Sequence, residues 1–394
     1  MNKGNSVLML AYAQYYNDAR IKGYVRALLE AGIAVDLICL RDPHSTNTAV
    51  GGVPLSITFV QKKYQGESAV RYLVNYILFF ARTCFLVTGK YFHKRHEVIH
   101  VHNQPDFLVL AALVPKFFGA MVILDMHDVM MAAVLTKFQN GARTFLYRLT
   151  KFQTWISVKM CDILICADHS QKEFLCENGI VHPCTAVMMN LPDDQLFTRR
   201  GTIPHHPIIR LIYHGTLSYR LGLDLAIRAV EKGRQAVPLT LTIIGDGEQK
   251  RALIRYCEEK KLLHSIVEFS DFVPVEQLQG LIEEYDIGIV ANRRSLLSER
   301  CMLPVKLMEY LAVGLPVVVP RLPVIQRYFT EDMVSYYEPE DVNEMSERIA
   351  ELAASPNLRL QKVQNAGLFF KKHAWKEQAM DYLTLVQSNR KASH

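Results

Sequence analysis

The sequence lacks a strong excess of charge of either sign. It carries 45 lysine and arginine residues against 39 aspartate and glutamate residues, a formal net charge of +6. This balance is too mild to indicate a nucleic-acid partner, and it suits small anionic molecules and an anionic membrane surface equally well. Half of the residues are hydrophobic and 21% are charged, which is typical of a globular chain rather than a disordered one.

Cysteine pairs with metal-binding or redox spacing are also lacking. None of the eight cysteines forms a CxxC pair, and several, such as Cys39, lie inside apolar, strand-like runs. We interpret them as small buried hydrophobic residues in a protein from a reducing compartment. The N-terminal stretch has one basic residue and a short apolar run that soon meets polar residues, which indicates a first buried strand rather than a signal peptide.

No long hydrophobic run passes without interruption. Residues 71–90 approach membrane-spanning length, but Asn75 and Arg82 interrupt them. A charged residue near the centre of a span costs about 2.5–3.5 kcal/mol on insertion scales. The segment also stands between two strand-like runs of one apparent domain. It is therefore predicted to be a helix that is buried or that lies on a membrane surface.

Short apolar runs alternate with segments of helical periodicity along the whole chain. In the first half, strands are predicted near residues 7–12, 34–41, 98–102, 121–128, 162–167 and 186–190. In the second half they are predicted near residues 209–215, 239–247, 266–272, 286–292 and 316–320. Buried strands that alternate with helices are typical of doubly wound parallel sheets. The predicted fold class is therefore α/β, with two Rossmann-like domains.

A stretch rich in proline and charge, residues 192–208, has no periodicity and is the predicted linker. The predicted domains accordingly span residues 1–197 and 198–375. Residues 376–394 are predicted to form a C-terminal helix that can cross back to the first domain. Because doubly wound sheets bind ligands at the carboxyl ends of their strands, a cleft between the two domains is the expected ligand site.

Polar and small residues stand at four of the predicted strand ends. They are His102 and Asn103; His127 and Asp128; His214, Gly215 and Thr216; and Gly245, Asp246 and Gly247. Four such endings in register with the strand pattern favour a ligand site. The histidines lack the spacing of a helical metal site, so no metal is expected.

Two opposite charges lie near the start of an otherwise apolar helix. Pro304 can open this helix, and Lys306 and Glu309 are then neighbours on one helical face. The two residues can form an ordinary surface ion pair, which contributes little. A buried helix that starts at a cleft instead offers amides and a cation to an anion, while its carboxylate accepts hydrogen bonds from hydroxyl groups. A diphosphate and a ribose together present that combination.

The segment LPVKLMEYLAVGLPVVVP, residues 303–320, resembles the P-x-K-x-x-E-Y-x-A-x-G-x-P-V signature of a branch of glycosyltransferase family 4. Further segments resemble the same branch, namely residues 100–128, 187–197, 213–230 and 242–253. Members of this family are two-domain GT-B enzymes that use nucleotide sugars and retain the anomeric configuration. The resemblance implies that the first domain binds the acceptor and the second binds the nucleotide sugar.

The resemblance also implies roles for individual residues. Glu309 is expected to accept hydrogen bonds from the ribose hydroxyls of the donor. The implied donor-binding residues are Gly215, Thr216, Arg220, Gly245, Asp246, Gly247, Val273, Pro304, Lys306, Leu307 and Glu309. The implied catalytic residues are His127, Asp128, Arg220 and Lys306, and those on the acceptor side are His102, Asn103 and Asp106.

The chain departs from the family pattern at several positions. Cys301 stands where the broader family has a second glutamate, with Glu299 nearby but out of register. Thr216 and Leu221 stand where an arginine and a lysine are usual. Two other cations are predicted to replace that pair on the diphosphate, namely Arg220 and Lys306. The His-Asp pair at residues 127–128 is also not followed by the common Pro-Glu pair.

The sequence therefore predicts a retaining glycosyltransferase that moves a sugar from a nucleotide-diphosphate sugar to an acceptor. The predicted acceptor is a lipid-linked saccharide in polysaccharide or glycolipid biosynthesis, and neither a cofactor nor a metal is expected. One alternative is an epimerase or hydrolase of nucleotide sugars on the same scaffold. Another is a catalytically idle subunit that binds a nucleotide or a partner enzyme, which the Cys301 departure allows.

Basic and aromatic residues of the first half predict contact with the cytoplasmic face of the cell membrane. The helix 71–89 runs into Lys90, Lys94 and Arg95, beside Tyr91 and Phe92. Residues 137–160 mix Lys137, Arg143, Arg148, Lys151 and Lys159 with Phe138, Phe145, Tyr147, Phe152 and Trp155. Such a mixture suits an interfacial helix. It also suits the solvent face of a helix that flanks a parallel sheet.

Overall fold

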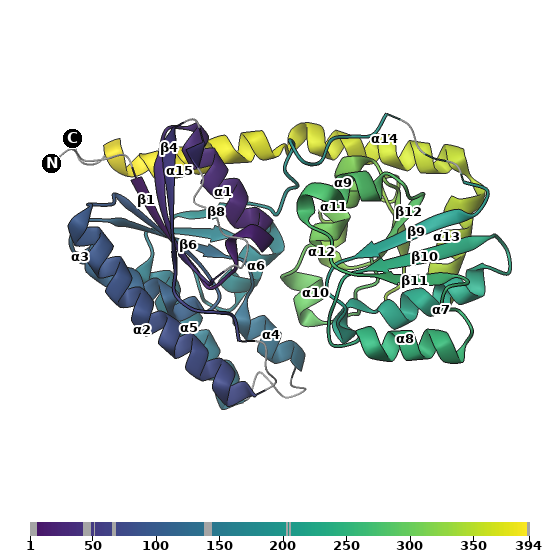
Figure 1. The fold of residues 1–394 in the computed structure, drawn as a ribbon, viewed down its shortest axis with the longest axis horizontal. Coiled ribbons are helices and arrows are strands. Elements are labelled where there is room, and N and C mark those ends of the chain that lie inside the picture. Colours follow the sequence, from purple (N-terminus) through teal and green to yellow (C-terminus); the bar gives the residue numbers. More distant parts are fainter. Residues whose placement is uncertain are drawn as a thin grey trace. The chain divides into compact units, whose positions relative to one another are not determined.

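The chain folds into two compact units in this computed structural model. The structure describes residues 6–41, 49–50, 52–64, 68–137, 144–201, 204 and 206–391. Unit 1 comprises Met1–Met189 and Lys376–His394, and unit 2 comprises Asn190–Trp375. Each unit is built from helices packed on a sheet of mainly parallel strands (Figure 1).

Unit 1 is built on an eight-stranded sheet of order β3-β4-β2-β1-β5-β6-β7-β8. Its strands are β1 (Ser6–Ala11), β2 (Ala34–Cys39), β3 (Ala49–Val50), β4 (Val53–Phe59), β5 (Val98–His102), β6 (Met121–Met126), β7 (Ile163–Cys166) and β8 (Thr185–Val187). All neighbours run parallel except β3 and β4. Strands β1, β5 and β6 are buried along their whole length, as expected for a sheet that is covered on both faces.

Helices cover both faces of this sheet (Figure 1). Helices α1 (Ala19–Glu30) and α15 (Trp375–Lys391) lie on one side, and α2 (Ala69–His93), the 3-10 helix η2 (Asp106–Ala112), α3 (Leu113–Phe117) and α5 (Phe145–Met160) lie on the other. The remaining helices are η1 (Tyr15–Asn17), α4 (Met130–Lys137) and α6 (His169–Glu177). Four helices begin at a side-chain oxygen that accepts from the third helical N–H, on Asp18, Ser68, Thr144 and Asp168.

The C-terminal helix α15 belongs to unit 1. The buried Tyr382 hydroxyl lies 2.8 Å from Nδ1 of His100, and the Tyr382 ring packs 4.4 Å from the ring of Tyr24. The Gln378 side chain exchanges two hydrogen bonds, of 2.7 and 2.8 Å, with the backbone of Met189. These contacts tie α15 to both β5 and α1.

Unit 2 contains a six-stranded, all-parallel sheet of order β11-β10-β9-β12-β13-β14. The strands are β9 (Ile209–His214), β10 (Leu239–Ile244), β11 (Val267–Ser270), β12 (Ile287–Ile289), β13 (Val317–Pro320) and β14 (Ser335–Tyr337). From the central strand β9 the chain continues to β10 and β11 on one side, and it then crosses to β12 on the other side of β9. The carboxyl ends of β9 and β12 therefore form the switch point at which doubly wound sheets bind ligands.

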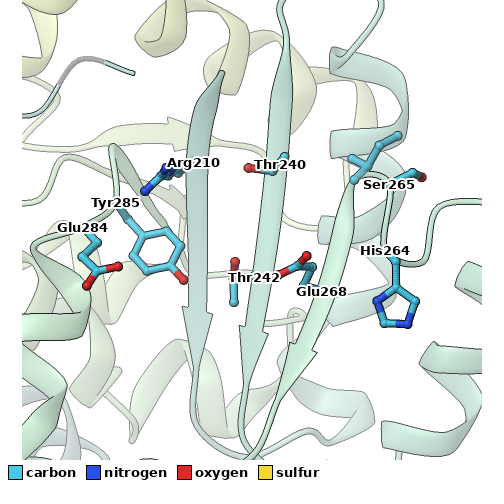
Figure 2. Close-up of a pocket in the computed structure, with 9 residues that line it drawn as sticks. Arg210, Thr240, Thr242, His264, Ser265, Glu268, Glu284 and Tyr285 are labelled. Carbon is cyan, nitrogen blue, oxygen red and sulfur yellow. The ribbon is translucent and has the colours of Figure 1, made fainter. Parts of the chain in front are cut away.

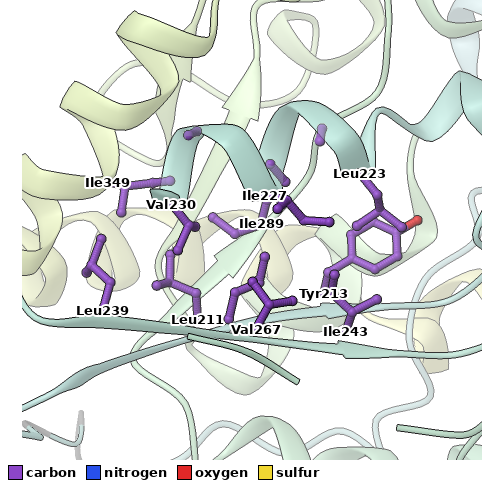
Figure 3. Packing of buried hydrophobic residues seen from close by; sticks show 14 of the residues in the cluster. Leu211, Tyr213, Leu223, Ile227, Val230, Leu239, Ile243, Val267, Ile289 and Ile349 are labelled. Carbon is purple, nitrogen blue, oxygen red and sulfur yellow. The ribbon is translucent and has the colours of Figure 1, made fainter. Parts of the chain in front are cut away.

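One core of unit 2 lies between the sheet and two amphipathic helices (Figure 3). Leu211, Tyr213 and Ile243 point from the strands toward Ile227 of α7 (Leu223–Gly233) and Ile349 of α13 (Val342–Ala354). The other helices are η4 (Tyr219–Leu221), α8 (Lys250–Glu259), α9 (Val275–Ile282), α10 (Leu296–Arg300), α11 (Val305–Val313), α12 (Pro323–Gln326) and α14 (Pro356–Lys372).

The boundary between the units lies at Met189–Asn190, upstream of the predicted position at residues 197–198. The backbone N–H of Thr198 donates to Gln279 of α9 at 2.7 Å, and that of Arg200 donates to the Val313 carbonyl of α11 at 2.9 Å. The described part of the predicted linker thus lies on unit 2, because its backbone finds hydrogen-bond partners there.

Two predicted helices differ from the structure. Residues 106–119 form the 3-10 helix η2 and then the short α3, since Pro115 has no N–H with which to continue an α-helical ladder. The predicted helix 137–160 corresponds to the last residue of α4 and to α5. Phe138 and Arg143 lie outside the described residues. The predicted helix at residues 71–90 is confirmed as α2.

Candidate functional site

The loops that follow β9 and β10 approach each other closely at the carboxyl edge of the unit 2 sheet. The Leu217 N–H donates to the Asp246 carbonyl at 2.9 Å. A Cβ atom on Gly245 would lie 2.0 Å from the Gly215 carbonyl oxygen, and one on Gly247 would lie 2.4 Å from the Leu217 carbonyl oxygen. Glycine is therefore required at residues 245 and 247 for the two loops to pack, whatever ligand they bind.

Helix α11 begins at the same edge of the sheet. Pro304 occupies its N-cap position, and the buried Leu307 anchors the helix to the core. The Tyr310 hydroxyl accepts a hydrogen bond of 3.0 Å from the His214 N–H, which locks the helix to the end of β9. Glu309 is buried as well, with Oε2 3.2 Å from Nε2 of His214. This carboxylate is thus held at the end of the central strand.

The side chain of Lys306 ends in a buried position without a hydrogen-bond partner. Its Nζ lies 3.6 Å from the centroid of the Tyr213 ring and would lie 3.6 Å from a Cβ on Gly215. Burial lowers the pKa of Lys306 from 10.5 to about 7; Glu309 opposes this shift and Arg220 adds to it. Buried ammonium groups normally have hydrogen-bond partners, and an anionic ligand at the Gly215 loop would give Lys306 such a partner.

Besides Lys306 and His214, more residues at this edge have buried polar atoms without hydrogen-bond partners. They are Ser218, in the loop after β9, and Asn292, in the loop after β12. The loop that holds Asn292 is fixed to η4, because the Arg293 N–H donates to the Arg220 carbonyl at 2.9 Å. With Lys306, these side chains bring polar atoms without hydrogen-bond partners to the switch point. Such an arrangement is suited to a polar ligand.

The remaining predicted donor-binding residues occupy loops of the same edge. Arg220 is exposed on η4, with Nη1 2.8 Å from the Met302 sulfur. Thr216 is exposed beside Gly215, and Val273 lies half-buried between β11 and α9. These positions leave the Arg220 guanidinium more accessible to water than the Lys306 ammonium.

Cys301 occupies the position at which the broader family has a second glutamate. Cys301 is buried at the end of α10. Glu299 forms an ion pair with Arg294 at 3.3 Å.

The predicted residues of unit 1 gather around a carboxylate that the sequence did not single out. Asp125 of β6 accepts two hydrogen bonds from the Arg20 guanidinium, of 2.6 and 2.8 Å. Its Oδ2 also lies 3.0 Å from Nε2 of His127 and 3.2 Å from Nδ1 of His102. A charged residue inside an apolar strand needs such partners, and this was the signal that could have identified Asp125.

The cluster sets the protonation of its members. Burial opposes ionisation of Asp125, but Arg20 and His127 outweigh it and hold the pKa of Asp125 well below its usual range. Burial also disfavours the charged form of His127, yet Asp125 outweighs it and raises the pKa of His127. Burial lowers the pKa of His102. His127 is therefore the histidine of this group that holds a proton most readily.

The residues predicted on the acceptor side are buried and bonded to the protein. The Asn103 side chain accepts from the His127 N–H at 2.7 Å and donates to Asp106 at 2.9 Å. The second oxygen of Asp106 accepts from the Thr154 hydroxyl at 2.7 Å. Direct contact between these two side chains and an acceptor would have to replace these bonds. Asp128 is half-buried and accepts a 3.4 Å contact from Gln104.

Within the described part of the chain, one group of potential metal ligands gathers in unit 1. Atoms of His100, His102 and Asp125 lie within 4.8 Å of one another. The Arg20 guanidinium already occupies both oxygens of Asp125, and its charge would repel a cation. The group therefore fits a hydrogen-bond network better than a metal ion.

A hollow of about 290 Å³ lies elsewhere on unit 2, over β9, β10 and β11 (Figure 2). Arg210, Thr240, Thr242 and Glu268 line it, and they alternate along their strands with the core residues. None of the predicted site residues lines this hollow. It is thus distinct from the carboxyl edge that carries Lys306 and Glu309.

Residues 209–355 match the family described as glycosyl transferases group 1. The matched segment lies within unit 2. It contains every predicted donor-binding residue, from Gly215 to Glu309.

Two relatives cover parts of the chain. A subunit of the phosphatidylinositol N-acetylglucosaminyltransferase of Arabidopsis thaliana is 23% identical over 251 residues, which are 63% of this chain and 53% of the relative. The putative colanic acid biosynthesis glycosyltransferase WcaL of Escherichia coli is 28% identical over 144 residues, which are 36% of this chain and 35% of the relative. The chain therefore spans about half or less of the length of these relatives.

Solved structures match the whole chain. Sucrose-phosphate synthase from Thermosynechococcus elongatus has a TM-score of 0.79 at 14% identity, covering 98% of this chain and 100% of that one. HepE of Anabaena in complex with UDP and glucose has a TM-score of 0.70 at 12% identity, covering 97% and 99%. These likenesses confirm the predicted fold class, two parallel-sheet α/β units of the GT-B type.

Proposed function

We propose that this protein is a retaining glycosyltransferase of family 4 that transfers a sugar from a nucleotide-diphosphate sugar to a lipid-linked saccharide. The observation that carries the proposal is the buried Lys306 ammonium, which lies beside Gly215 without a hydrogen-bond partner. It stands in the segment that matches the glycosyl transferases group 1 family. The related structure of HepE holds UDP and glucose, which supports a donor of this class.

The proposed roles follow from charge and position. Lys306 and Arg220 bind the diphosphate and stabilise the charge that grows on the leaving group. Glu309 accepts hydrogen bonds from the ribose hydroxyls, and Gly215 leaves room for the phosphates at the end of β9. The acceptor hydroxyl attacks the anomeric carbon from the face that the nucleoside diphosphate leaves. The bond from this carbon to the diphosphate oxygen breaks, and that oxygen takes the hydroxyl proton, so no protein general base is assigned. His127, whose pKa is raised by Asp125, acts on the donor sugar or the acceptor.

The lipid-linked acceptor is proposed from the relatives. One is named for transfer to phosphatidylinositol and another for colanic acid biosynthesis. We also propose that the protein acts at the inner face of the cell membrane, because a lipid-linked acceptor is held in a membrane. We propose that neither a metal nor a cofactor is needed, since Lys306, Arg220 and the start of α11 supply positive charge to the diphosphate.

A screen of nucleotide sugars tests the proposal. A donor that binds the folded chain raises its melting temperature. Release of nucleoside diphosphate is then measured with and without a lipid-linked saccharide. Acceptor-dependent release supports a transferase, equal release in both cases indicates a hydrolase, and a new sugar isomer without release indicates an epimerase. Binding without any turnover indicates the idle subunit that the Cys301 departure allows.

The ribose assignment has its own test. Glu309→Gln keeps the shape of the side chain but weakens its charge-assisted hydrogen bonds, which contribute roughly 1.5–3 kcal/mol. Donor affinity should fall about tenfold or more while the melting temperature of the unliganded protein stays close to that of the wild type. Unchanged donor affinity in a well-folded variant would remove Glu309 from the ribose site.

A further inference from the structure

The outer helical layer of unit 1 exposes large apolar side chains on three helices. The most exposed are Phe85 of α2, Phe117 of α3 and Phe145 of α5, at 85%, 86% and 80% of their accessible surface. Helices α2, α3 and α5 all lie on the same side of the sheet (Figure 1). Exposed apolar side chains that gather on one side of a unit are typical of an interaction surface.

Helix α2 is the centre of this surface. Among the described residues, Val70–His93 is the one helix that is long and apolar enough to cross a membrane by length and composition, and 17% of its apolar window is buried. A soluble core helix would be mostly buried. The exposed face of α2 therefore has no cover within the described part of unit 1.

One face of α2 is nevertheless built into the unit. Phe79, Thr83, Val87 and Tyr91 form a buried stripe at helical spacing. The Tyr91 hydroxyl also donates to the Phe118 carbonyl, at the end of α3, at 3.0 Å. To span a bilayer, α2 would have to leave this packing. The helix is therefore suited to lie along a membrane surface.

The three helices themselves carry charge of one sign, although Asp162, just after α5, pairs with Lys116 of α3. Residues 69–96, 107–124 and 129–161 contain no aspartate or glutamate. Exposed cations flank the apolar side chains, namely Arg71, Arg95, Arg148 and Lys159. Lys90 and Lys94, which the sequence suggested for membrane contact, instead lie 3.6 and 3.1 Å from Asp36.

This charge pattern separates the two simplest occupants. A second copy of the chain in a two-fold dimer would bring the same cations together across the interface, where they would repel. An anionic lipid surface attracts them and also takes up the exposed aromatic side chains.

We propose that α2, α3 and α5 dock unit 1 onto an anionic bilayer, with their axes along the membrane surface and with Phe85, Phe117 and Phe145 inserted into it. The functional meaning of this surface rests on the proposed lipid-linked acceptor. The docking itself involves neither donor nor acceptor, so vesicle binding can fail while nucleotide binding succeeds, and the reverse.

The test mixes the full-length protein with phosphatidylcholine vesicles, with and without phosphatidylglycerol, and separates bound protein by flotation. Binding should need phosphatidylglycerol and should weaken between about 0.1 M and about 1 M salt, as the Debye length falls from about 10 Å to about 3 Å. Bound protein should be released by alkaline carbonate, which leaves spanning helices in place. Absence of binding in every condition, or retention in carbonate, would overturn the proposal.

Variants locate the surface. Phe85→Glu combined with Phe145→Glu should weaken vesicle binding about tenfold or more, because each change removes an inserted aromatic side chain and adds a negative charge. Met380→Glu is the matched control, since Met380 is 55% exposed on α15 at the other face of the sheet. Its binding should stay within about twofold of the wild type. Equal losses of vesicle binding in the double variant and in Met380→Glu would overturn the assignment. The assignment would also be wrong if the wild type bound no vesicles but formed a dimer that Phe85→Glu dissociates.

Thermal shift with a nucleotide sugar, run on the same samples, checks the integrity of unit 2. The Phe85 and Phe145 variants should keep their donor-induced shift while they lose vesicle binding. Loss of both in these variants would mean that the fold was damaged, and Phe117→Glu alone then serves as the decisive variant, because α3 is the shortest of the three helices.

Discussion

A buried cluster in unit 1 and a buried lysine in unit 2 treat charge in opposite ways, although unit 2 also holds a paired buried charge, Arg359 with Asp286 at 2.9 Å. In unit 1, Arg20 and His127 both lie within hydrogen-bonding distance of Asp125. In unit 2, the Lys306 ammonium is buried against the Tyr213 ring without a hydrogen-bond partner. Removal of one partner from a satisfied network leaves an uncompensated charge, whereas an unsatisfied cation is stabilised only when an anion arrives. The first arrangement supports the fold, and the second is suited to binding.

The largest expected effect is on the unit 1 cluster. Asp125→Asn keeps the shape of the side chain but leaves the Arg20 guanidinium buried without its counter-charge. Loss of one partner of a buried ion pair costs about 3–5 kcal/mol of unfolding free energy. Urea and thermal unfolding measure this loss. Asp128→Asn, three residues along the same segment, should cost less than about 1 kcal/mol, and equal costs for both variants would contradict the contrast between the two units.

Lys306→Met should act on binding rather than on the fold. Affinity for a nucleotide sugar should fall about tenfold or more, since charge-assisted hydrogen bonds contribute roughly 1.5–3 kcal/mol each. The lowered pKa of Lys306 means that the unfolded chain binds this proton more tightly. The charged lysine therefore opposes folding below pH 7, and this penalty fades as the pH rises toward 10.5.

Calorimetry and unfolding at pH 6 test both parts of this prediction. The unliganded Lys306→Met variant should be at least as stable as the wild type. Lys232→Met, an exposed lysine at the end of α7, is the control and should leave donor affinity unchanged. A variant that is both less stable and fully able to bind would reverse the roles assigned to the two units.

The pH dependence of donor binding sharpens the comparison further. Above pH 7 the unliganded Lys306 loses its proton, and an anionic ligand must restore it. Affinity should therefore fall between pH 7 and 9, by at most about tenfold per pH unit for one proton taken up. Calorimetry in buffers of different ionisation enthalpy measures that uptake. A flat profile in the wild type, or the same slope in Lys306→Met, would exclude Lys306 as the titrating group.

Arg220→Met should have the smallest effect on the donor. Its guanidinium is exposed, so salt and water weaken its attraction to a phosphate. We expect turnover to fall by about twofold to tenfold, with a smaller loss at high salt than at low salt. Turnover measured across a salt series tests this. Values within about twofold of the wild type at low salt would remove Arg220 from the proposed pair.

Local patterns in the sequence predicted most of the strands and the Lys306–Glu309 helix. Alternation of apolar and helical segments is a property of neighbouring residues, and so is the i, i+3 relation of these two charges. Gly245 and Gly247 were also predicted, although the structure gives them a packing role that composition cannot show. Strands β3, β4 and β14 were missed. Strands β3 and β14 are too short to show a period, whereas the seven residues of β4 include Pro54, which weakens a strand pattern.

Partners that are far apart in the sequence were not predictable. The pairing of Arg20 with Asp125 joins α1 to β6, and no local period encodes it. The same is true of the contacts of Lys90 and Lys94 with Asp36, which change the expected set of membrane-facing cations. The sequence shows which residues carry charge, but only the structure shows which of these charges are paired with an opposite charge.

The return of α15 to unit 1 has a consequence for how the protein is made. Unit 2 is one continuous segment, whereas unit 1 needs two segments that flank it. During synthesis, at about 5–20 residues per second, unit 2 can complete its fold before α15 has left the ribosome. Until then, His100 and Tyr24 lack the Tyr382 ring that packs against them. The first unit to emerge is therefore the last to be finished, and a nascent chain interrupted before residue 376 would expose His100 and Tyr24 to chaperones and proteases.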